Sequence, residues 1–230
     1  MMGRPMAEDL RFAKYQALGN DFIVIDARGE PGLVNDEALA RGLLDRHFGV
    51  GADNLIFVTE SNVADLGMRI RTPAGAWLTM CGNGIRCFAR YVRDAGICAA
   101  DPLRIQTDAG VRETRWIGGD DVLIEADLLE PDLRASAIPT TLAAPAERVL
   151  DVPLNFGALG TVRVSCVSVG NPHGVFFVDH LDSADMRLLG PAIERHAAFP
   201  EGVNVHAAQV LSADRARIST WERGAGLTLA

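Results

Sequence analysis

Residues 18–26, LGNDFIVID, and residues 169–179, VGNPHGVFFVD, are two versions of one short segment. Within them, Asn20 and Asn171 lie 151 positions apart. The same offset separates four further pairs: Phe48 and Phe199, Gly51 and Gly202, Asp53 and Asn204, and Gly75 and Gly226. A constant offset shared by several short matches indicates a duplicated structural unit. The sequence therefore predicts two structurally similar halves.

The segment between the two halves differs from both in composition. Residues 128–145 hold three prolines and several small or polar residues, which is typical of a linker or crossover. We therefore expect an N-terminal half at 1–127 and a C-terminal half at 146–230. The repeat places the counterpart of Cys81 just after Ala230. We expect the second half to lack that cysteine and the helix after it, which would leave an apolar sheet face open to water.

Composition excludes several classes of protein. The chain has 230 residues, of which 48% are hydrophobic and 23% charged, so a folded core is expected. The net charge of −8 argues against a nucleic-acid or anionic-membrane partner. The longest apolar runs are strand-sized, and the N-terminus lacks the apolar core of a secretory signal. Four cysteines without paired close spacing suggest reduced thiols in a cytoplasmic protein.

Short strands outnumber helices in the pattern of apolar residues. We expect strands at 11–16, 22–26, 54–58, 68–71, 103–107, 122–125, 162–168, 175–178, 203–210 and 216–221. Three helices are expected, at 36–48 with Asn35 as its cap, at 84–95 with Gly96 ending it, and at 185–196. Lys14, the only lysine, lies in a predicted strand, which makes the chain a poor candidate for pyridoxal phosphate, a cofactor that needs a lysine.

Cys81 is the strongest candidate for a chemical role. It opens the sequence Cys-Gly-Asn-Gly directly before a predicted helix, where free N–H groups attract an anion and favour a thiolate. The two glycines let the backbone approach a ligand closely. The alternative is a tight strand-to-helix turn with an inert, buried thiol. A nucleotide phosphate is a weaker alternative, since the third glycine and a Gly-Lys-Ser/Thr sequence are missing.

The remaining thiols and imidazoles show no metal pattern. Cys87, Cys98 and Cys166 have no zinc-type spacing, and core or partly exposed thiols are the better interpretation. The histidines at 47, 180, 196 and 206 show no metal spacing either. We expect no metal and no cofactor.

Polar residues at strand edges suggest a site for an amino acid. Asn20, Asn171 and Asn204 lie beside glycine, proline or valine near strand ends, and an amide both donates and accepts hydrogen bonds. Each alone is more often a turn residue, but their repeat-related positions favour a shared ligand. Glu222 and Arg223, in WERGAG, could hold an ammonium and a carboxylate, or form a surface ion pair of little consequence. His173, in NPHG, could orient or protonate a nearby group.

These stretches together resemble the diaminopimelate epimerase family. The matching sequences, in the expected order, are ALGNDFIVID, GVGADNLIFV, MCGNGIRCFARYV, VSVGNPHGVFFVD, FPEGVNV and WERGAG. The resemblance implies an α+β fold of two pseudo-symmetric domains, each a curved mixed sheet wrapped around a central helix, with the second domain incomplete here. It also implies a homodimer.

The resemblance further implies a cofactor-free, two-base reaction at the α-carbon of an amino acid, with one cysteine from each domain. Cys81 matches the first cysteine, and His173 and Glu222 match residues thought to tune the cysteines. Substrate contacts are implied for nine positions, namely Asn20, Asn54, Thr72, Gly82, Asn83, Asn171, Asn204, Glu222 and Arg223.

This chain departs from the family pattern at several positions. Thr72 stands where the family has a substrate-binding asparagine, and Asn54 where many members have glutamine. Leu227 replaces a glutamate, and the second cysteine is absent from residues 1–230. A buried polar group left without its partner costs about 1–3 kcal/mol, so these changes bear directly on the substrate.

We therefore expect an isomerase that converts LL-2,6-diaminopimelate to the meso isomer, a reaction of lysine and peptidoglycan precursor synthesis. Two alternatives remain open. The first is a racemase or epimerase of another amino acid on the same fold. The second is a protein that binds an amino acid without turning it over.

Overall fold

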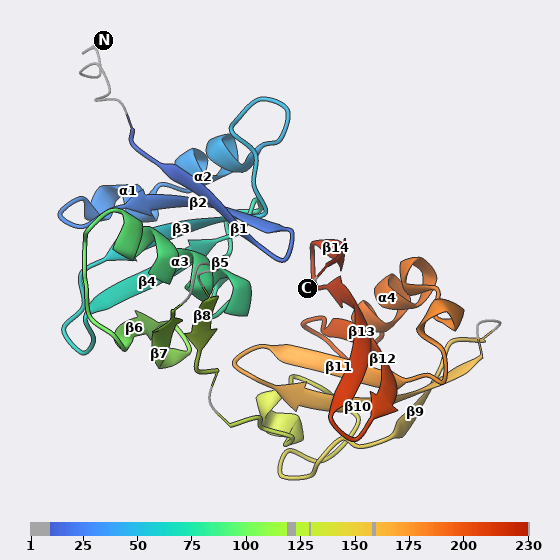
Figure 1. Ribbon diagram of the computed structural model, residues 1–230. Helices are drawn as coiled ribbons and strands as arrows, with labels where there is room; N and C mark the ends of the chain where they lie inside the picture. Colours follow the sequence, from blue (N-terminus) through green and yellow to red (C-terminus); the bar gives the residue numbers. More distant parts are fainter. Residues whose placement is uncertain (1–9, 119–122, 129, 158–159, 230) are drawn as a thin grey trace. The chain divides into compact units, whose positions relative to one another are not determined.

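The computed structural model describes residues 10–118, 123–128, 130–157 and 160–229. An eight-stranded mixed sheet forms from the first part of the chain, in the order β1-β2-β3-β4-β6-β7-β8, with β5 paired to β4 (Figure 1). Its strands are β1 Ala13–Ala17, β2 Asn20–Asp26, β3 Asn54–Thr59, β4 Leu66–Arg71, β5 Trp77–Leu78, β6 Leu103–Thr107, β7 Gly110–Ile117 and β8 Leu123–Ala126. The pairs β2–β3 and β4–β6 are parallel, and β3–β4, β6–β7 and β7–β8 are antiparallel.

Helix α3, Gly82–Asp94, packs in the concave side of this sheet against strands that include β1, β3, β7 and β8 (Figure 1). Its apolar side chains Ile85, Phe88 and Val92 are fully buried. The helix ends before Gly96, whose positive φ of 65° a side chain would disfavour. The prediction of an amphipathic helix ended by Gly96 is confirmed, and the helix begins two residues earlier than expected.

Two short helices, α1 Pro31–Asn35 and α2 Glu37–Leu44, cover the other face of the sheet. They pack on Ile23, Leu55 and Phe57, which alternate along their strands with the residues that face α3. The prediction of one helix over 36–48 capped by Asn35 is wrong. Asp36 has an extended backbone and caps α2 itself, because its carboxylate accepts a hydrogen bond from the Leu39 N–H at 2.9 Å.

A six-stranded mixed sheet forms from the second part of the chain, in the order β14-β13-β12-β11-β10-β9 (Figure 1). Its strands are β9 Val152–Asn155, β10 Thr161–Ser168, β11 Pro172–Phe177, β12 Asn204–Ser212, β13 Arg215–Glu222 and β14 Gly226–Thr228. Strands β11 and β12 are parallel, and the other neighbours are antiparallel. In both sheets the strand that holds the repeated segment, β2 or β11, pairs in parallel with the next strand along the chain, β3 or β12.

One face of this second sheet is covered by α4, Met186–Glu194, together with the 3-10 helices Ala135–Ala137 and Leu181–Ser183. The core here includes Val164, Phe176 and Val205 from the strands and Ile193 from α4. Ile138, from the stretch between the two halves, is fully buried in the same core.

The opposite face of the second sheet exposes apolar side chains. Phe177 and Ile218 both pair with Ala208 in the strand register, so they lie on the same face of the sheet. They are 64% and 56% exposed. Val210, two residues along β12, is 62% exposed.

The chain divides into two compact units. The first comprises Asp21–Asp127 with the segment up to Ala17, and the second comprises Leu128–Ala230 with Leu18–Asn20. Each unit combines a curved mixed sheet with few helices, so the fold is α+β with two domains. Within the described residues, no helix has the length and apolar character needed to cross a membrane.

Candidate functional site

Cys81 is the N-cap residue of α3. Its backbone is extended, its carbonyl accepts the first helical hydrogen bond from Ile85 N–H at 2.9 Å, and its Sγ accepts a hydrogen bond from the Gly84 N–H at 3.4 Å. A Cβ at position 84 would lie 3.3 Å from both the Cys81 Cβ and the Phe22 ring, which accounts for the glycine there. The partly exposed thiol thus lies at the positive end of the helix dipole, where a thiolate is favoured.

Asn83 is held beside Cys81 by a residue that the sequence did not single out. The Arg86 guanidinium donates hydrogen bonds to the Asn83 Oδ1 and, at 2.9 Å, to the carbonyl of Gly82. Because arginine can only donate, the oxygen of the Asn83 amide must face Arg86. The NH₂ group of Asn83 therefore faces away from Arg86. The spacing of three residues on a helix was the available signal for Arg86.

Asn54 and Thr72 lie at the same end of the first sheet. Leu55 on β3 pairs with Arg71 on β4, so one further step along this antiparallel register places Asn54 opposite Thr72. The Thr72 hydroxyl accepts a hydrogen bond from the Ala76 N–H at 3.2 Å, within the turn that leads to β5. The Thr72 hydroxyl is therefore already engaged in a hydrogen bond within its own turn.

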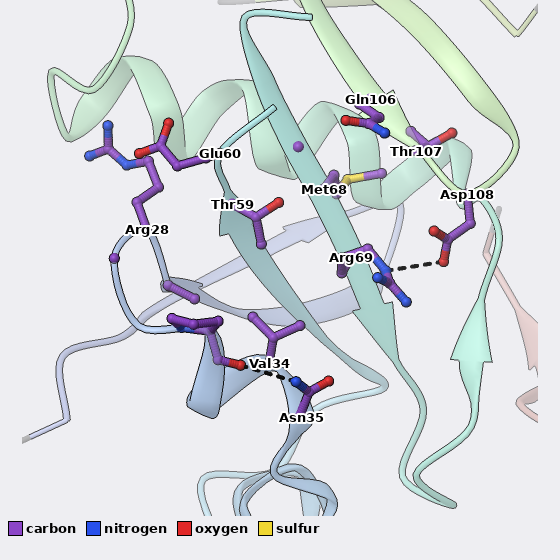
Figure 2. Close-up of a pocket in the computed structure, with 14 residues that line it drawn as sticks. Arg28, Val34, Asn35, Thr59, Glu60, Met68, Arg69, Gln106, Thr107 and Asp108 are labelled. Carbon is purple, nitrogen blue, oxygen red and sulfur yellow. Dashed lines mark hydrogen bonds and ion pairs between the residues drawn. The ribbon is translucent and has the colours of Figure 1, made fainter. Parts of the chain in front are cut away.

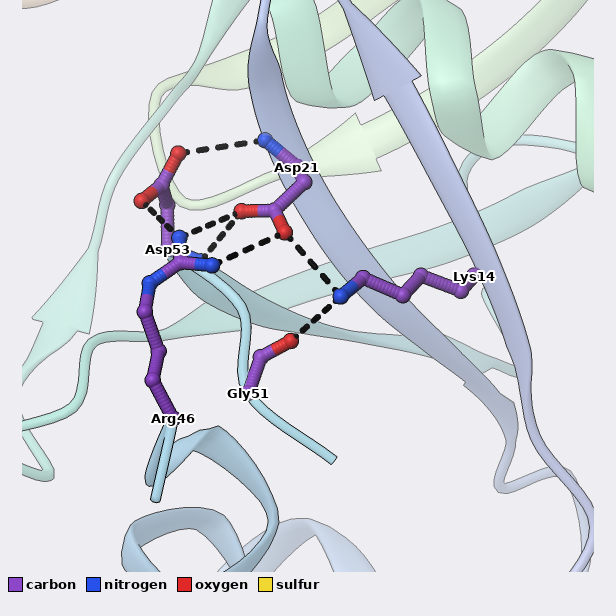
Figure 3. Close-up of polar contacts among 5 residues, drawn as sticks. All are labelled: Lys14, Asp21, Arg46, Gly51 and Asp53. Carbon is purple, nitrogen blue, oxygen red and sulfur yellow. Dashed lines mark hydrogen bonds and ion pairs between the residues drawn. The ribbon is translucent and has the colours of Figure 1, made fainter. Parts of the chain in front are cut away.

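Asn20 is the first residue of β2 and is 2% exposed. Its neighbour Asp21 lies in a charged cluster with Lys14, Arg46 and Asp53 (Figure 3). The Arg46 guanidinium bridges Asp21 Oδ1 at 2.7 Å and Asp53 Oδ1 at 2.6 Å. The Lys14 ammonium contacts Asp21 at 3.2 Å and donates to the Gly51 carbonyl at 2.7 Å (Figure 3).

This charged cluster was not predicted from sequence, although two of its members adjoin predicted site residues. Asp21 follows Asn20, and Asp53 precedes Asn54. Burial alone would raise the pKa of Asp21, but hydrogen bonds from Arg46, the Asp53 N–H and Lys14 outweigh it and lower that pKa to about 2. Asp21 therefore remains charged at neutral pH, and the cluster ties the starts of β2 and β3 together.

In the second unit, Asn171 and His173 belong to a chain of polar side chains. His173 Nε2 lies 2.7 Å from Asn171 Oδ1, and its Nδ1 lies 2.7 Å from Nε2 of His206. The His206 Nδ1 in turn lies 3.0 Å from the hydroxyl of Thr220. Sequence analysis set His206 aside because it fits no metal pattern. Its position two residues after Asn204 on β12 was the signal, since i and i+2 share a face of a strand.

Asn204 is buried and uses both ends of its amide within the second unit. Its Nδ2 donates to the carbonyl of Pro172 at 3.0 Å, and its Oδ1 accepts from the Arg223 N–H at 2.9 Å. The guanidinium of Arg223 donates to the Glu201 carbonyl at 2.9 Å. The Glu222 carboxylate accepts a hydrogen bond from the Thr228 hydroxyl at 3.3 Å. Asn204 thus fixes the position of the Arg223 backbone.

The predicted residues therefore fall into two groups, each at one end of its own sheet. The first group is Asn54, Thr72, Cys81, Gly82 and Asn83 around the start of α3, with Asn20 at the start of the neighbouring strand. The second group is Asn171, His173, Asn204, Glu222 and Arg223, where β11 and β12 begin and β13 ends.

A cavity of about 490 Å³ lies elsewhere in the first unit, and none of the predicted site residues line it. Figure 2 shows it on the face of the sheet away from α3, lined by residues that include Arg28, Asn35 and Arg69. The Arg28 guanidinium forms a bidentate pair with Asp26, and Arg69 lies 3.2 Å from Asp108. Both cations of this cavity already have carboxylate partners.

Cys87 and Cys166 are poor nucleophiles. Burial raises the pKa of Cys87 to about 12, with a further contribution from Cys81, and burial alone raises that of Cys166 to about 12. Cys98 is partly exposed. Across the ranges that the structure describes, no group of three or more histidine, cysteine or acidic side chains could hold a metal ion.

Comparison with known proteins accounts for nearly the whole chain. The family described as diaminopimelate epimerase matches residues 12–126 and 165–230. A diaminopimelate epimerase of Synechocystis sp. is 45% identical over 224 residues, covering 96% of this chain and 78% of the relative. That of Moorella thermoacetica is 43% identical over 223 residues, covering 96% and 79%.

Solved structures agree in fold at much lower sequence identity. A hydroxyproline epimerase from Agrobacterium vitis superimposes with a TM-score of 0.65 at 15% identity, over 95% of this chain and 72% of that one. A probable proline racemase from Agrobacterium radiobacter gives a TM-score of 0.66 at 15% identity, with the same coverage. At this low identity the solved structures show the fold alone, whereas the sequence match decides the family. The chain belongs to the diaminopimelate epimerase family.

Proposed function

We propose that this protein is an isomerase that converts LL-2,6-diaminopimelate to meso-diaminopimelate, the reaction named by its relatives at 45% and 43% identity. The observation that carries the proposal within this chain is the position of Cys81. Its thiol caps a buried amphipathic helix and is partly exposed, whereas Cys87 and Cys166 are buried. In this proposal the product serves lysine and peptidoglycan precursor synthesis.

The proposed chemistry is proton exchange at the substrate α-carbon without a cofactor. The Cys81 thiolate removes the α-proton, and the N–H groups at the start of α3 stabilise the negative charge that develops on the α-carboxylate. The Asn83 amide, held by Arg86, would contribute a further hydrogen bond to the substrate at the same place. Inversion needs a proton delivered to the opposite face of the α-carbon. We propose that the family's second cysteine, which is not among residues 1–230, serves that step.

The second group of residues provides further donors and acceptors for the same substrate in this proposal. Arg223 would bind a carboxylate and Glu222 an ammonium group, while His173 would orient or tune a neighbouring group. Asn204 would act indirectly, because both ends of its amide are engaged with the protein.

The proposal is tested by incubating the protein with LL-diaminopimelate in D₂O and measuring both deuterium at the α-carbon and the stereochemistry of the product. We expect deuterium incorporation at the α-carbon, with inversion where the second thiol is also supplied, and we expect both to be lost in Cys81→Ala. Cys98→Ala is the matched control, since its partly exposed thiol lies outside the proposed site. Exchange without inversion would show a one-base reaction, and full activity in Cys81→Ala would remove the proposal.

A second candidate substrate is favoured by two observations. Asn54 and Thr72 lie opposite each other at the proposed site, and the Thr72 hydroxyl already accepts a hydrogen bond from Ala76. These differences suit racemisation of a different amino acid on the same fold. A panel of L-amino acids assayed for racemisation separates the two candidates, since turnover restricted to diaminopimelate excludes the second.

The same proposal includes a cytoplasmic location, a homodimer, and no nucleic-acid or membrane partner. The net charge of −8 supports the last of these. Light scattering coupled to gel filtration measures the mass in solution, and a monomer mass near 24.7 kDa at working concentration would contradict the dimer.

A further inference from the structure

The rings of His173 and His206 meet edge to edge in the second unit, nitrogen to nitrogen. Their centroids are 5.0 Å apart, the planes are inclined by 27°, and the nearest ring nitrogens are 2.7 Å apart. Asn171 lies at one end of this pair and Thr220, which is 3% exposed, at the other. Four polar side chains from β11, β12, β13 and the turn before β11 thus form one continuous chain of hydrogen bonds.

The chemistry of the end groups gives this chain a direction. The Asn171 Oδ1 can only accept, so His173 must carry its proton on Nε2. A neutral imidazole has one N–H, which leaves His173 Nδ1 as an acceptor. The proton between the rings therefore belongs to His206 Nε2. The His206 Nδ1 then accepts the hydroxyl proton of Thr220.

Both rings are neutral under ordinary conditions. Burial, with the charges of His206 and Arg223 in addition, lowers the pKa of His173 to about 4. Burial lowers the pKa of His206 to about 4 as well. At neutral pH each ring therefore holds one proton, and its position is decided by the hydrogen-bonding partners rather than by charge.

We propose that His206 and Thr220 are positioning residues, which hold the His173 imidazole as its Nε2–H tautomer and thereby keep the Asn171 carbonyl oxygen turned toward His173. The Asn171 NH₂ group then becomes the end that can donate to an oxygen of a bound molecule. This last consequence rests on the proposed function, whereas the tautomer is a property of the chain itself.

The tautomer can be measured directly by nitrogen NMR on the 230-residue protein. The chain has five histidines, at 47, 173, 180, 196 and 206, so their ring signals can be assigned by single substitutions. At pH 7 we expect His173 and His206 each to show a protonated Nε2 and an unprotonated Nδ1. An Nδ1–H tautomer at either ring would overturn the proposal.

Two pairs of variants separate positioning from folding. His206→Gln keeps an N–H donor near the position of Nε2 and should retain the Nε2–H tautomer of His173, while His206→Leu removes the donor and should yield a tautomer mixture. Thr220→Ser should behave as wild type, and Thr220→Val should disturb the His206 tautomer. His180→Gln, at an exposed histidine, is the control.

The outcomes distinguish this proposal from the proposed function. Unchanged His173 signals in His206→Leu, with the amide spectrum still showing a folded protein, would refute the positioning role. If His206→Leu fails to fold, Thr220→Val supplies the same comparison, and an unchanged His206 tautomer there would refute it. Loss of activity towards diaminopimelate in the wild type would leave all of these NMR results standing.

Discussion

Asp21 and Asp53 exchange hydrogen bonds between backbone and side chain. The Asp21 N–H donates to Asp53 Oδ2 at 3.1 Å, and the Asp53 N–H donates to Asp21 Oδ1 at 2.9 Å (Figure 3). The Asp53 N–H also approaches the Asp21 carbonyl at 3.1 Å. Two carboxylates can share this geometry because the Arg46 guanidinium contacts both. The arrangement joins the residues that follow Asn20 and precede Asn54.

Asp21→Asn should destabilise the protein by about 2 kcal/mol, the range for hydrogen bonds to a charged group. The Asp21 side chain is only 17% exposed and accepts from Arg46, Lys14 and a backbone N–H, so its charge is not readily replaced by water. Glu37→Gln is the control, because the Glu37–Arg41 pair is more than half exposed and should change stability by less than about 0.5 kcal/mol. Urea unfolding measures both, and equal effects would contradict the role assigned to Asp21.

The same carboxylate predicts a loss of stability in acid. The pKa of Asp21 is about 2 in the folded chain, against 3.8 for an aspartate without these partners. As the pH falls, the unfolded state therefore binds the proton first. Its contribution is present above about pH 3.8 and is lost as the pH falls toward 2. The unfolding free energy of wild type should therefore fall more steeply over this range than that of Asp21→Asn. Parallel curves would contradict the prediction.

Alkylation should discriminate among the four thiols. Burial raises the pKa of Cys87 and Cys166 from 9.0 to about 12, so at neutral pH each holds roughly a thousandfold less thiolate than an ordinary cysteine. Iodoacetamide at pH 7 should modify Cys81 and Cys98 and leave the other two intact until the protein unfolds. Peptide mass spectrometry measures the order, and early labelling of Cys87 would show that α3 opens readily.

Two helical glycines should respond to alanine in opposite directions. A Cβ at Gly190 would lie 2.5 Å from the Trp221 ring, so Gly190→Ala must displace that ring and should cost about 1–3 kcal/mol. Gly42 lies inside α2 with nothing within 4 Å of such a Cβ, so Gly42→Ala should stabilise the protein by up to about 1 kcal/mol. Thermal unfolding compares them, and a neutral Gly190→Ala would show that α4 is loosely packed.

Sequence patterns predicted the elements whose local signals agree with their packing. The buried strands β2, β3 and β6 and the helix α3 carry clear apolar periodicity, and all four were identified. Strand β7, GVRETRWI, was missed because its buried positions carry Arg112 and Thr114 rather than apolar residues. The two-residue β5 and the short β14 are too brief for any periodic signal.

The contacts among site residues were less accessible from sequence. The repeat and the family resemblance identified Asn83 and His173, but not Arg86 and His206, which form hydrogen bonds with them. Arg86 resembles any surface arginine of a helix, and His206 acquires its partner only through the parallel pairing of β11 with β12. Side-chain orientation depends on such tertiary contacts, for which a linear motif carries no signal. The roles of the individual site residues and the domain boundaries stay predictions.

The buried histidine pair predicts a second pH dependence, separate from that of Asp21. Burial lowers the pKa of both His173 and His206 to about 4 from 6.5, so between these values the unfolded chain is protonated while the folded chain is not. Stability is therefore complete above about pH 6.5 and declines as the pH falls toward 4, by up to about 1.4 kcal/mol per pH unit for each histidine. His206→Gln removes one of the two titrating groups and should reduce this slope by about half. Urea unfolding at pH 7, 6, 5 and 4.5 measures it, with His180→Gln as the control. If the slope in His206→Gln equals that of wild type, the histidine pair does not control stability in this range, and the neutral rings must be explained by some other group.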